Sequence, residues 1–140
     1  MIVKEIMTTN VCFVKPEATV PQVVKQMMSE NIGFVPICDN VGNLLGVITD
    51  RDIIMRAFFL GTSDLSDLAA SEIMTTDIAT VAPTMNIHDA ALVFSAHKVR
   101  RLPVLENSKL VGVLSMSDLA KKKIFLAEVG DIFGAITKGV

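Results

Sequence analysis

The chain has 140 residues, of which 51% are hydrophobic, and a formal net charge of −2. This slight excess of acidic groups argues against binding to nucleic acids or anionic membranes, because both need a strongly basic face. No apolar run reaches the roughly 18 residues of a membrane span and no signal-peptide core begins the chain, so we expect a cytoplasmic protein with no membrane partner.

The first half opens with the letters E-I-M-T-T at residues 5–9, and a short strand is predicted at residues 11–14. Pro16 ends this strand, because proline has no N–H to offer to a sheet. Thr19 with Gln22 three residues later is a capping-box pattern, which predicts the start of a helix. The predicted apolar face of this helix has helical spacing and consists of Val20, Val23, Val24, Met27 and Met28.

A hairpin and a second helix complete the first half. Apolar strands are predicted at residues 34–38 and 44–48, with the turn letters D-N-V-G-N between them. A helix is expected over residues 51–59. The polar, turn-rich residues 61–67 indicate a linker.

The second half repeats the first. E-I-M-T-T returns at residues 72–76, and the same elements follow in the same order. We predict a strand at residues 78–81, a helix started by Asn86 and Asp89, strands at 101–105 and 110–114, and a helix from Ser117 to about residue 129. The expected apolar face of the first of these helices consists of Ile87, Ala90, Ala91 and Phe94.

A repeat of this length determines the architecture. A unit of about 60 residues is marginal alone, whereas the pair can bury about two-thirds of its surface. We therefore predict an α/β (α+β) fold, in which two pseudo-symmetric β-α-β-β-α repeats pack into one module. The predicted boundaries are residues 1–60 for the first repeat, 61–67 for the linker, 68–127 for the second repeat and 128–140 for a C-terminal tail.

The two hairpins carry matching motifs. Their first strands contain V-P-I and L-P-V, and their second strands run into G-V-I-T-D-R-D and G-V-L-S-M-S-D. Occurring twice in this order, these motifs resemble the cystathionine-β-synthase (CBS) domain, and the pair resembles a Bateman module over about residues 1–127. The resemblance implies a regulatory module that binds AMP, ADP, ATP or S-adenosylmethionine in a cleft between the repeats. It also implies a disc-like homodimer and no obligatory cofactor.

The resemblance assigns ribose binding to Thr49, Asp52, Ser115 and Asp118. Each pair lies where a strand passes into a helix, so a carboxylate and helix N–H groups are expected to face the same space. A carboxylate in this position can accept hydrogen bonds from both ribose hydroxyls. The same S/T-x-x-D pattern is also a capping box that needs no ligand, and the two roles are compatible.

Candidate phosphate-binding charge is concentrated in the second copy. Arg100 and Arg101 occupy the positions that Gly33 and Phe34 have in the first copy, and Arg51 is a third candidate. Guanidinium groups bind phosphate oxygens through a forked pair of donors. A charge cluster is also typical of a solvated face. We expect two similar but chemically unequal sites.

For the adenine ring, the resemblance implies an apolar slot with backbone hydrogen-bonding groups. These side chains suit a hydrophobic core as well, so their assignment depends on the analogy. The candidates are Thr9, Val11, Val35, Pro36, Thr76, Ile78, Leu102 and Pro103.

The sequence does not predict an enzyme. His88 and His97 have no nucleophile pattern beside them, and no His, Cys or Asp cluster has metal-ligand spacing. Cys12 and Cys38 suit small buried apolar positions in predicted strands. Mg²⁺ is expected only as a companion of a bound phosphate, near Asp50 and Asp52.

The apolar surplus predicts self-association. The chain contains eight Met and seven Phe, and excess apolar surface usually marks an interface. We expect a homodimer and, for a stand-alone module, a separate regulated protein. The alternative function is a structural dimerisation module without a ligand. The candidate interface residues are Ile53, Ile54, Phe58, Phe59 and Leu60 before the linker, and Ile124, Phe125, Leu126, Val129, Ile132 and Phe133 near the C-terminus.

Overall fold

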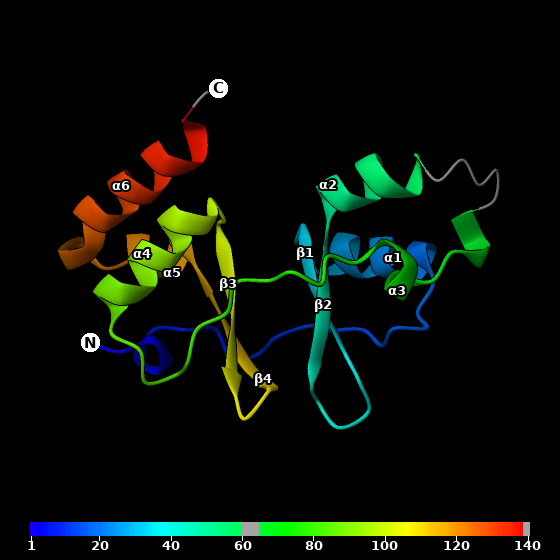
Figure 1. The fold of residues 1–140 in the computed structure, drawn as a ribbon, viewed down its shortest axis with the longest axis horizontal. Coiled ribbons are helices and arrows are strands. Elements are labelled where there is room, and N and C mark those ends of the chain that lie inside the picture. Colours follow the sequence, from blue (N-terminus) through cyan, green and yellow to red (C-terminus); the bar gives the residue numbers. More distant parts are fainter. Residues whose placement is uncertain (60–64, 139–140) are drawn as a thin grey trace. The chain divides into compact units, whose positions relative to one another are not determined.

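The computed structural model describes residues 1–59 and 65–138, and Figure 1 shows the path of the chain. Two compact units are present. The β1–β2 unit is Cys12–Ile78, and the β3–β4 unit combines Met1–Val11 with Ala79–Val140. Each unit contains a two-stranded antiparallel sheet and several helices, which confirms the predicted α/β (α+β) class.

A helix, a hairpin and a short second helix follow one another in the same order in both units. The β1–β2 unit contains α1 (Val20–Glu30), β1 (Phe34–Cys38), β2 (Leu44–Thr49), α2 (Asp50–Asp52), a π-helical turn (Ile53–Ala57), a 3-10 turn (Leu65–Asp67) and α3 (Ala70–Ile73). The β3–β4 unit contains a 3-10 turn (Val3–Glu5), α4 (Ile87–His97), β3 (Arg101–Glu106), β4 (Lys109–Ser115), α5 (Met116–Ala120), a second 3-10 turn (Lys123–Phe125) and α6 (Leu126–Thr137).

The predicted start of each first helix is confirmed. The Thr19 hydroxyl accepts from the N–H of Gln22 at 3.3 Å, and the Gln22 side chain accepts from the N–H of Thr19 at 2.9 Å. Asn86 begins α4, although its side chain accepts from the N–H of His88, at 2.8 Å, and not from that of Asp89. Each cap supplies an acceptor for a backbone donor that the helix leaves unpaired.

Each unit has its own hydrophobic core, built between its first helix and its hairpin. The predicted α4 face is buried at all four positions. On α1, Met28 was expected in the buried face but is 77% exposed. The reason is that the core covers the side of α1 that carries Val20, Val23 and Met27, and Met28 lies at its edge.

The predicted strands at residues 11–14 and 78–81 are wrong: each is reduced to a single parallel bridge. Val14 donates to the carbonyl of Pro36 at 3.0 Å and accepts from the N–H of Cys38 at 2.9 Å. The next rungs of a parallel ladder would need N–H groups from Pro36 and Pro16, which proline lacks.

In the second repeat, prolines restrict the parallel pairing to a single bridge in the same way. Val81 donates to the carbonyl of Pro103 at 3.1 Å and accepts from Leu105 at 2.9 Å. Here Pro103 and Pro83 are the residues that cannot donate. The prolines that mark each motif therefore also stop the strand beside it.

The predicted second helices are also wrong in extent. The segment 51–59 is a single α-helical turn followed by the π-helical turn. The helix expected from Ser117 to about residue 129 stops at Ala120, and after a 3-10 turn the chain continues as α6 to Thr137. This break changes the chain direction, so that Phe125 and Ile132 are buried in the core that includes α4.

The predicted boundaries of repeats, linker and tail remain predictions. Leu60, residues 61–64 of the expected linker and residues 139–140 of the expected tail lie outside the described residues. Over the described ranges 1–59 and 65–138, no helix combines the length and apolar character of a membrane span.

The compact units do not follow the sequence repeats, because each E-I-M-T-T segment packs on a particular hairpin. Residues 5–9 precede β1 in the chain yet belong to the β3–β4 unit. Thr8 and Val113 exchange two backbone hydrogen bonds of 2.9 Å. In the β1–β2 unit, Thr75 and Val47 exchange the same pair at 2.8 and 3.0 Å.

These two bridges explain the glycine in each second strand. A Cβ atom on Gly112 would lie 2.7 Å from the Met7 sulfur and 2.9 Å from the Thr8 carbonyl oxygen. A Cβ atom on Gly46 would meet Met74 at 2.6 Å and the Thr75 carbonyl oxygen at 2.9 Å. Only glycine lets the E-I-M-T-T backbone approach this closely.

We predict that Gly112→Ala lowers the free energy of unfolding by about 1–3 kcal/mol, because the bridging Thr8 backbone has to move. Gly33→Ala is the matched control. Its Cβ would meet the Asp50 carboxylate at 2.7 Å, but that side chain is exposed and can rotate away. The control should therefore change stability by less than about 1 kcal/mol. Chemical denaturation of both variants gives the comparison, and equal losses would contradict the role of the bridge.

Candidate ligand-binding site

The start of α5 confirms the capping interpretation of the second S/T-x-x-D motif. The N–H of Asp118 donates to the Ser115 hydroxyl at 3.1 Å, and the N–H of Ser115 donates to Asp118 Oδ2 at 2.9 Å. The N–H of Met116 donates to the carbonyl of Arg100 at 2.9 Å. These donors were expected to face a ligand, but the protein itself uses them. With only five residues in α5, the expected contribution of a helix dipole is small.

The first motif has the same construction. Asp52 donates its N–H to the Thr49 hydroxyl at 3.2 Å, and Thr49 donates its N–H to Asp52 Oδ2 at 2.9 Å. The N–H of Asp50 donates to the carbonyl of Gly33 at 3.0 Å. Each carboxylate therefore uses one oxygen for the cap and keeps acceptor capacity on the other.

The E-I-M-T-T segments bring a hydroxyl group to that second oxygen. Thr8 Oγ1 lies 3.4 Å from Asp118 Oδ1, and Thr75 Oγ1 lies 3.4 Å from Asp52 Oδ1. Asp118 is only 8% exposed, and a buried carboxylate needs such partners. We did not predict the two threonines as site residues. The signal that could have identified them is that they occupy the same position in the two identical E-I-M-T-T segments.

Arg56 is a third site residue that the sequence did not predict. Its Nη1 donates to the carbonyls of Ile73 at 3.2 Å and Met74 at 2.9 Å, and its Nε lies 3.8 Å from Asp52 Oδ1. Arg56 therefore connects the first carboxylate to the E-I-M-T-T backbone. The equivalent residue of the second repeat is Lys122, which is exposed.

The predicted phosphate-binding arginines differ in position. Arg101 is the direct cross-strand partner of Ser115, and side chains of such partners share one face of a hairpin. Phe34 has the same relation to Thr49 in the other unit. The Arg100 side chain is exposed and its carbonyl accepts from α5, whereas Arg51 is exposed on α2. The structure thus brings Arg101 to the second motif.

The predicted adenine-slot residues fall into two groups. Val35 and Leu102 have no exposed surface, neither side chain nor backbone, and belong to the two cores. Pro36 and Pro103 are also buried. The residues whose side chains keep accessible surface are Thr9, Val11, Thr76 and Ile78.

Cys12, Cys38 and His88 are candidate reactive groups outside the two motifs. Burial, with the nearby Asp39 charge, raises the pKa of the Cys38 thiol to about 11. Burial also raises the pKa of Cys12, which is only half-buried. Both therefore remain thiols at neutral pH. His88 Nδ1 lies 2.7 Å from a Glu128 carboxylate oxygen. Within residues 1–59 and 65–138, no group of three or more His, Cys, Asp or Glu side chains could hold a metal ion.

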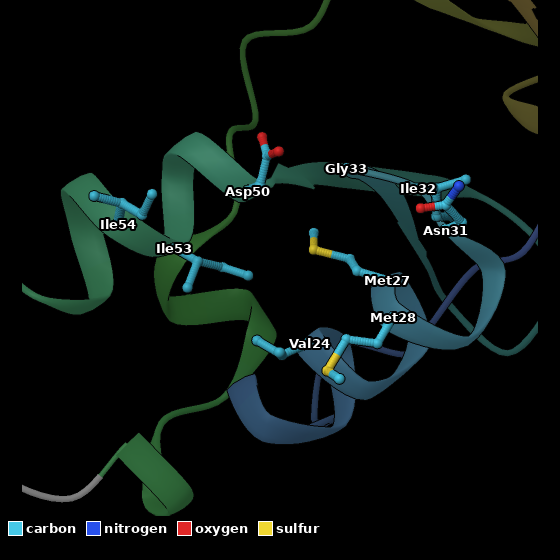
Figure 2. Close-up of a pocket in the computed structure, with 9 residues that line it drawn as sticks. All are labelled: Val24, Met27, Met28, Asn31, Ile32, Gly33, Asp50, Ile53 and Ile54. Carbon is cyan, nitrogen blue, oxygen red and sulfur yellow. The ribbon is translucent and has the colours of Figure 1, made fainter.

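The β1–β2 unit also has an apolar groove that we did not predict. Its volume is about 500 Å³. In Figure 2, Met27 of α1 and Ile53 of the π-helical turn extend into the space between the two helical segments. The groove is lined by Val24, Met27, Met28, Asn31, Ile32, Gly33, Asp50, Ile53 and Ile54.

Comparison with known proteins identifies the family. The CBS domain model matches residues 3–58 and 70–124. Over 118 residues the chain is 36% identical to the CBS domain-containing protein YhcV of Bacillus subtilis, covering 84% of this chain and 82% of that protein.

Solved structures share the fold. The CBS domain protein TA0289 of Thermoplasma acidophilum has a TM-score of 0.83 at 25% identity, covering 96% of this chain and 75% of that one. CBSX2, crystallised with AMP, has a TM-score of 0.77 at 23% identity, over 90% and 98% of the two chains. The CBS domain pair of MJ0100, crystallised with 5′-methylthioadenosine and S-adenosylmethionine, has a TM-score of 0.74 at 24% identity, over 86% and 94%. Two matched segments, each with the same capped aspartate motif, show that the chain belongs to the CBS domain family as a tandem pair.

Proposed function

We propose that this protein is a non-catalytic sensor that binds an adenosine-containing ligand, such as AMP, ADP, ATP or S-adenosylmethionine. The observation that carries the proposal is the pair of capped carboxylates, Asp52 and Asp118. Each is held in place by its cap, and its second oxygen has only long side-chain contacts of 3.4 Å or more, which a stronger donor can replace. The AMP and S-adenosylmethionine complexes of two proteins with this fold support the ligand class.

The ribose is the part of the ligand that these carboxylates suit. Two neighbouring hydroxyls can donate to one carboxylate, and hydrogen bonds to a charged acceptor are among the stronger ones. The threonine hydroxyls at 3.4 Å make long contacts that a ribose can replace. Because Thr8 and Thr75 belong to the bridging segments, replacement would transmit ligand binding to the backbone of residues 5–9 or 72–76.

The phosphate end differs between the two repeats. In the second repeat, Arg101 shares a face with Ser115, so this motif suits a ligand with more phosphate. In the first repeat Phe34 takes that place, which suits adenosine or the sulfonium group of S-adenosylmethionine better. Arg51 and Arg100 are exposed and supply further charge, and Mg²⁺ would enter with a phosphate-bearing ligand only.

The alternative is a structural module that dimerises and binds no ligand. Exposed apolar side chains favour self-association, and they include Ile54, Phe58 and Phe59 in the β1–β2 unit and Ile124, Leu126 and Phe133 in the β3–β4 unit. We propose a homodimer in either case. A thermal-shift series with AMP, ATP and S-adenosylmethionine separates the two functions, because a ligand at about 100 times its dissociation constant adds about 2.7 kcal/mol of stability.

Asp118→Asn and Asp52→Asn should each weaken binding of adenine nucleotides by about 1.5–3 kcal/mol, because a charge-assisted acceptor is lost while the amide oxygen can still accept the capping bond. Ser115→Ala is the control for the cap, since it removes the hydroxyl and leaves the carboxylate. It should lower the free energy of unfolding by about 1 kcal/mol. Calorimetric titration with AMP measures the affinity of each variant. If both asparagine variants bind AMP as tightly as the parent protein, the two carboxylates act only as helix caps and do not bind the ligand.

Arg101→Ala should reduce ATP binding far more than adenosine binding, because the guanidinium group contacts phosphate only. The ATP effect should shrink as salt rises, since ion pairs are screened over about 8–10 Å at physiological ionic strength. Lys109→Ala, at the far end of the same hairpin, is the matched control and should change neither affinity. Equal losses for ATP and adenosine, without a change of salt dependence, would make Arg101 a packing residue.

A further inference from the structure

The two E-I-M-T-T segments have the same sequence and the same backbone hydrogen bonds. Met7 and Met74 each donate an N–H to the carbonyl four residues earlier, at 2.9 and 3.0 Å. The next residues, Thr8 and Thr75, form the antiparallel bridges to the two hairpins. A difference in local stability between the two segments must therefore come from their surroundings.

Arg56 holds the segment of the first site from the side. Its Nη1 donates to two consecutive carbonyls, those of Ile73 at 3.2 Å and Met74 at 2.9 Å. Its Nε lies 3.8 Å from Oδ1 of Asp52, the oxygen that Thr75 Oγ1 also approaches, at 3.4 Å. One guanidinium group thus connects the candidate ribose-binding carboxylate to the segment that carries Thr75.

The local backbone explains how Arg56 reaches these groups. It lies in the π-helical turn Ile53–Ala57, four residues after Asp52 on the same helical segment. Such turns are rare and often occur at functional sites. A guanidinium group has five donors in a rigid fork, so it can contact carbonyls and a carboxylate at the same time.

The second site lacks this clamp. The residue that corresponds to Arg56 is Lys122, which is exposed and, within the described part of the chain, makes no side-chain hydrogen bond. Its backbone is extended, with φ −108° and ψ 111°, since helix α5 ends at Ala120. An ammonium group also lacks the fork of arginine. Residues 5–9 are therefore held by their backbone bonds and packing, without a cationic clamp.

We propose that Arg56 is a positioning residue that keeps the segment of the first site closed, that is, bridged to its hairpin. The segment of the second site then gives the larger response to a ligand. This inference depends on the ligand site proposed above and adds which segment responds. A ligand that binds the closed state removes open forms, so the change that it causes cannot exceed the open population present before binding. A clamped segment has few open forms to lose.

Amide hydrogen exchange, measured residue by residue by NMR, tests the clamp without any ligand. The amides of residues 7–8 are compared with those of residues 74–75, because identical neighbouring side chains give the two pairs the same exchange rate when they are open. We expect the pair at 74–75 to exchange at least about 10-fold more slowly, the effect of one hydrogen bond to a charged donor. Arg56→Lys keeps the charge and removes the fork. It should speed exchange at 74–75 by about the same factor and leave 7–8 unchanged.

The second measurement adds AMP at a concentration that calorimetry shows to be saturating. In the parent, the exchange rate should fall by a larger absolute amount at residues 7–8 than at 74–75, and in Arg56→Lys the two decreases should become similar. An arginine with a structural role alone would alter the ligand-free rates and leave the AMP-dependent decrease at 74–75 as in the parent. Lys25→Ala, exposed on α1, is the control and should change neither pair. Circular dichroism confirms that the variants fold.

Equal ligand-free rates in the two pairs of the parent, or rates at 74–75 that Arg56→Lys leaves unchanged, would overturn the clamp. If AMP binds and lowers the exchange rate more at 74–75 than at 7–8, the first site gives the response and the proposal is wrong. A failure of AMP, ATP and S-adenosylmethionine to bind would remove the proposed function, and the response with it. The ligand-free comparison would then still decide whether Arg56 holds the segment.

Discussion

The antiparallel bridge between an E-I-M-T-T segment and the glycine-containing strand of a hairpin is the contact on which the other features depend. Thr8 pairs with Val113, and Thr75 pairs with Val47. The bridge places each segment in a unit with a particular hairpin, so residues 5–9 belong with β3 and β4. Two backbone hydrogen bonds and a close contact over glycine make this placement specific, since a larger residue would meet a carbonyl oxygen.

The same bridge completes the candidate site. A cap fixes one oxygen of each aspartate, and the bridging threonine reaches the other. The hydroxyl contact is long and can be replaced, whereas the cap uses short bonds to the backbone. The candidate site therefore combines a carboxylate held by its cap with a longer, exchangeable contact, and we propose that this arrangement reports on ligand binding.

Much of this architecture could be predicted from the sequence. The repeated motifs predicted the hairpins and both aspartate sites, and capping residues predicted where α1 and α4 begin. The strands at 11–14 and 78–81 could not be predicted correctly, because their length depends on the register that places a proline of the neighbouring strand beside them. The roles of Thr8, Thr75 and Arg56 depend on contacts between residues far apart in the chain, which periodicity does not reveal. The exposure of Met28 and the full length of α6 depend on which surfaces the core covers.

We propose that an adenosine ligand binds at the capped aspartates and that the bridging segments respond to it. Amide hydrogen exchange with and without AMP tests it most directly, because it locates the response along the chain. A ligand stabilises the closed local structure by RT ln(1 + L/Kd), where L is the free ligand concentration, so the protection from exchange rises with ligand concentration. We expect slower exchange with saturating AMP at residues 7–9 and 113–118, or at 47–52 and 74–76. Unchanged exchange at both pairs of segments in millimolar AMP would contradict it.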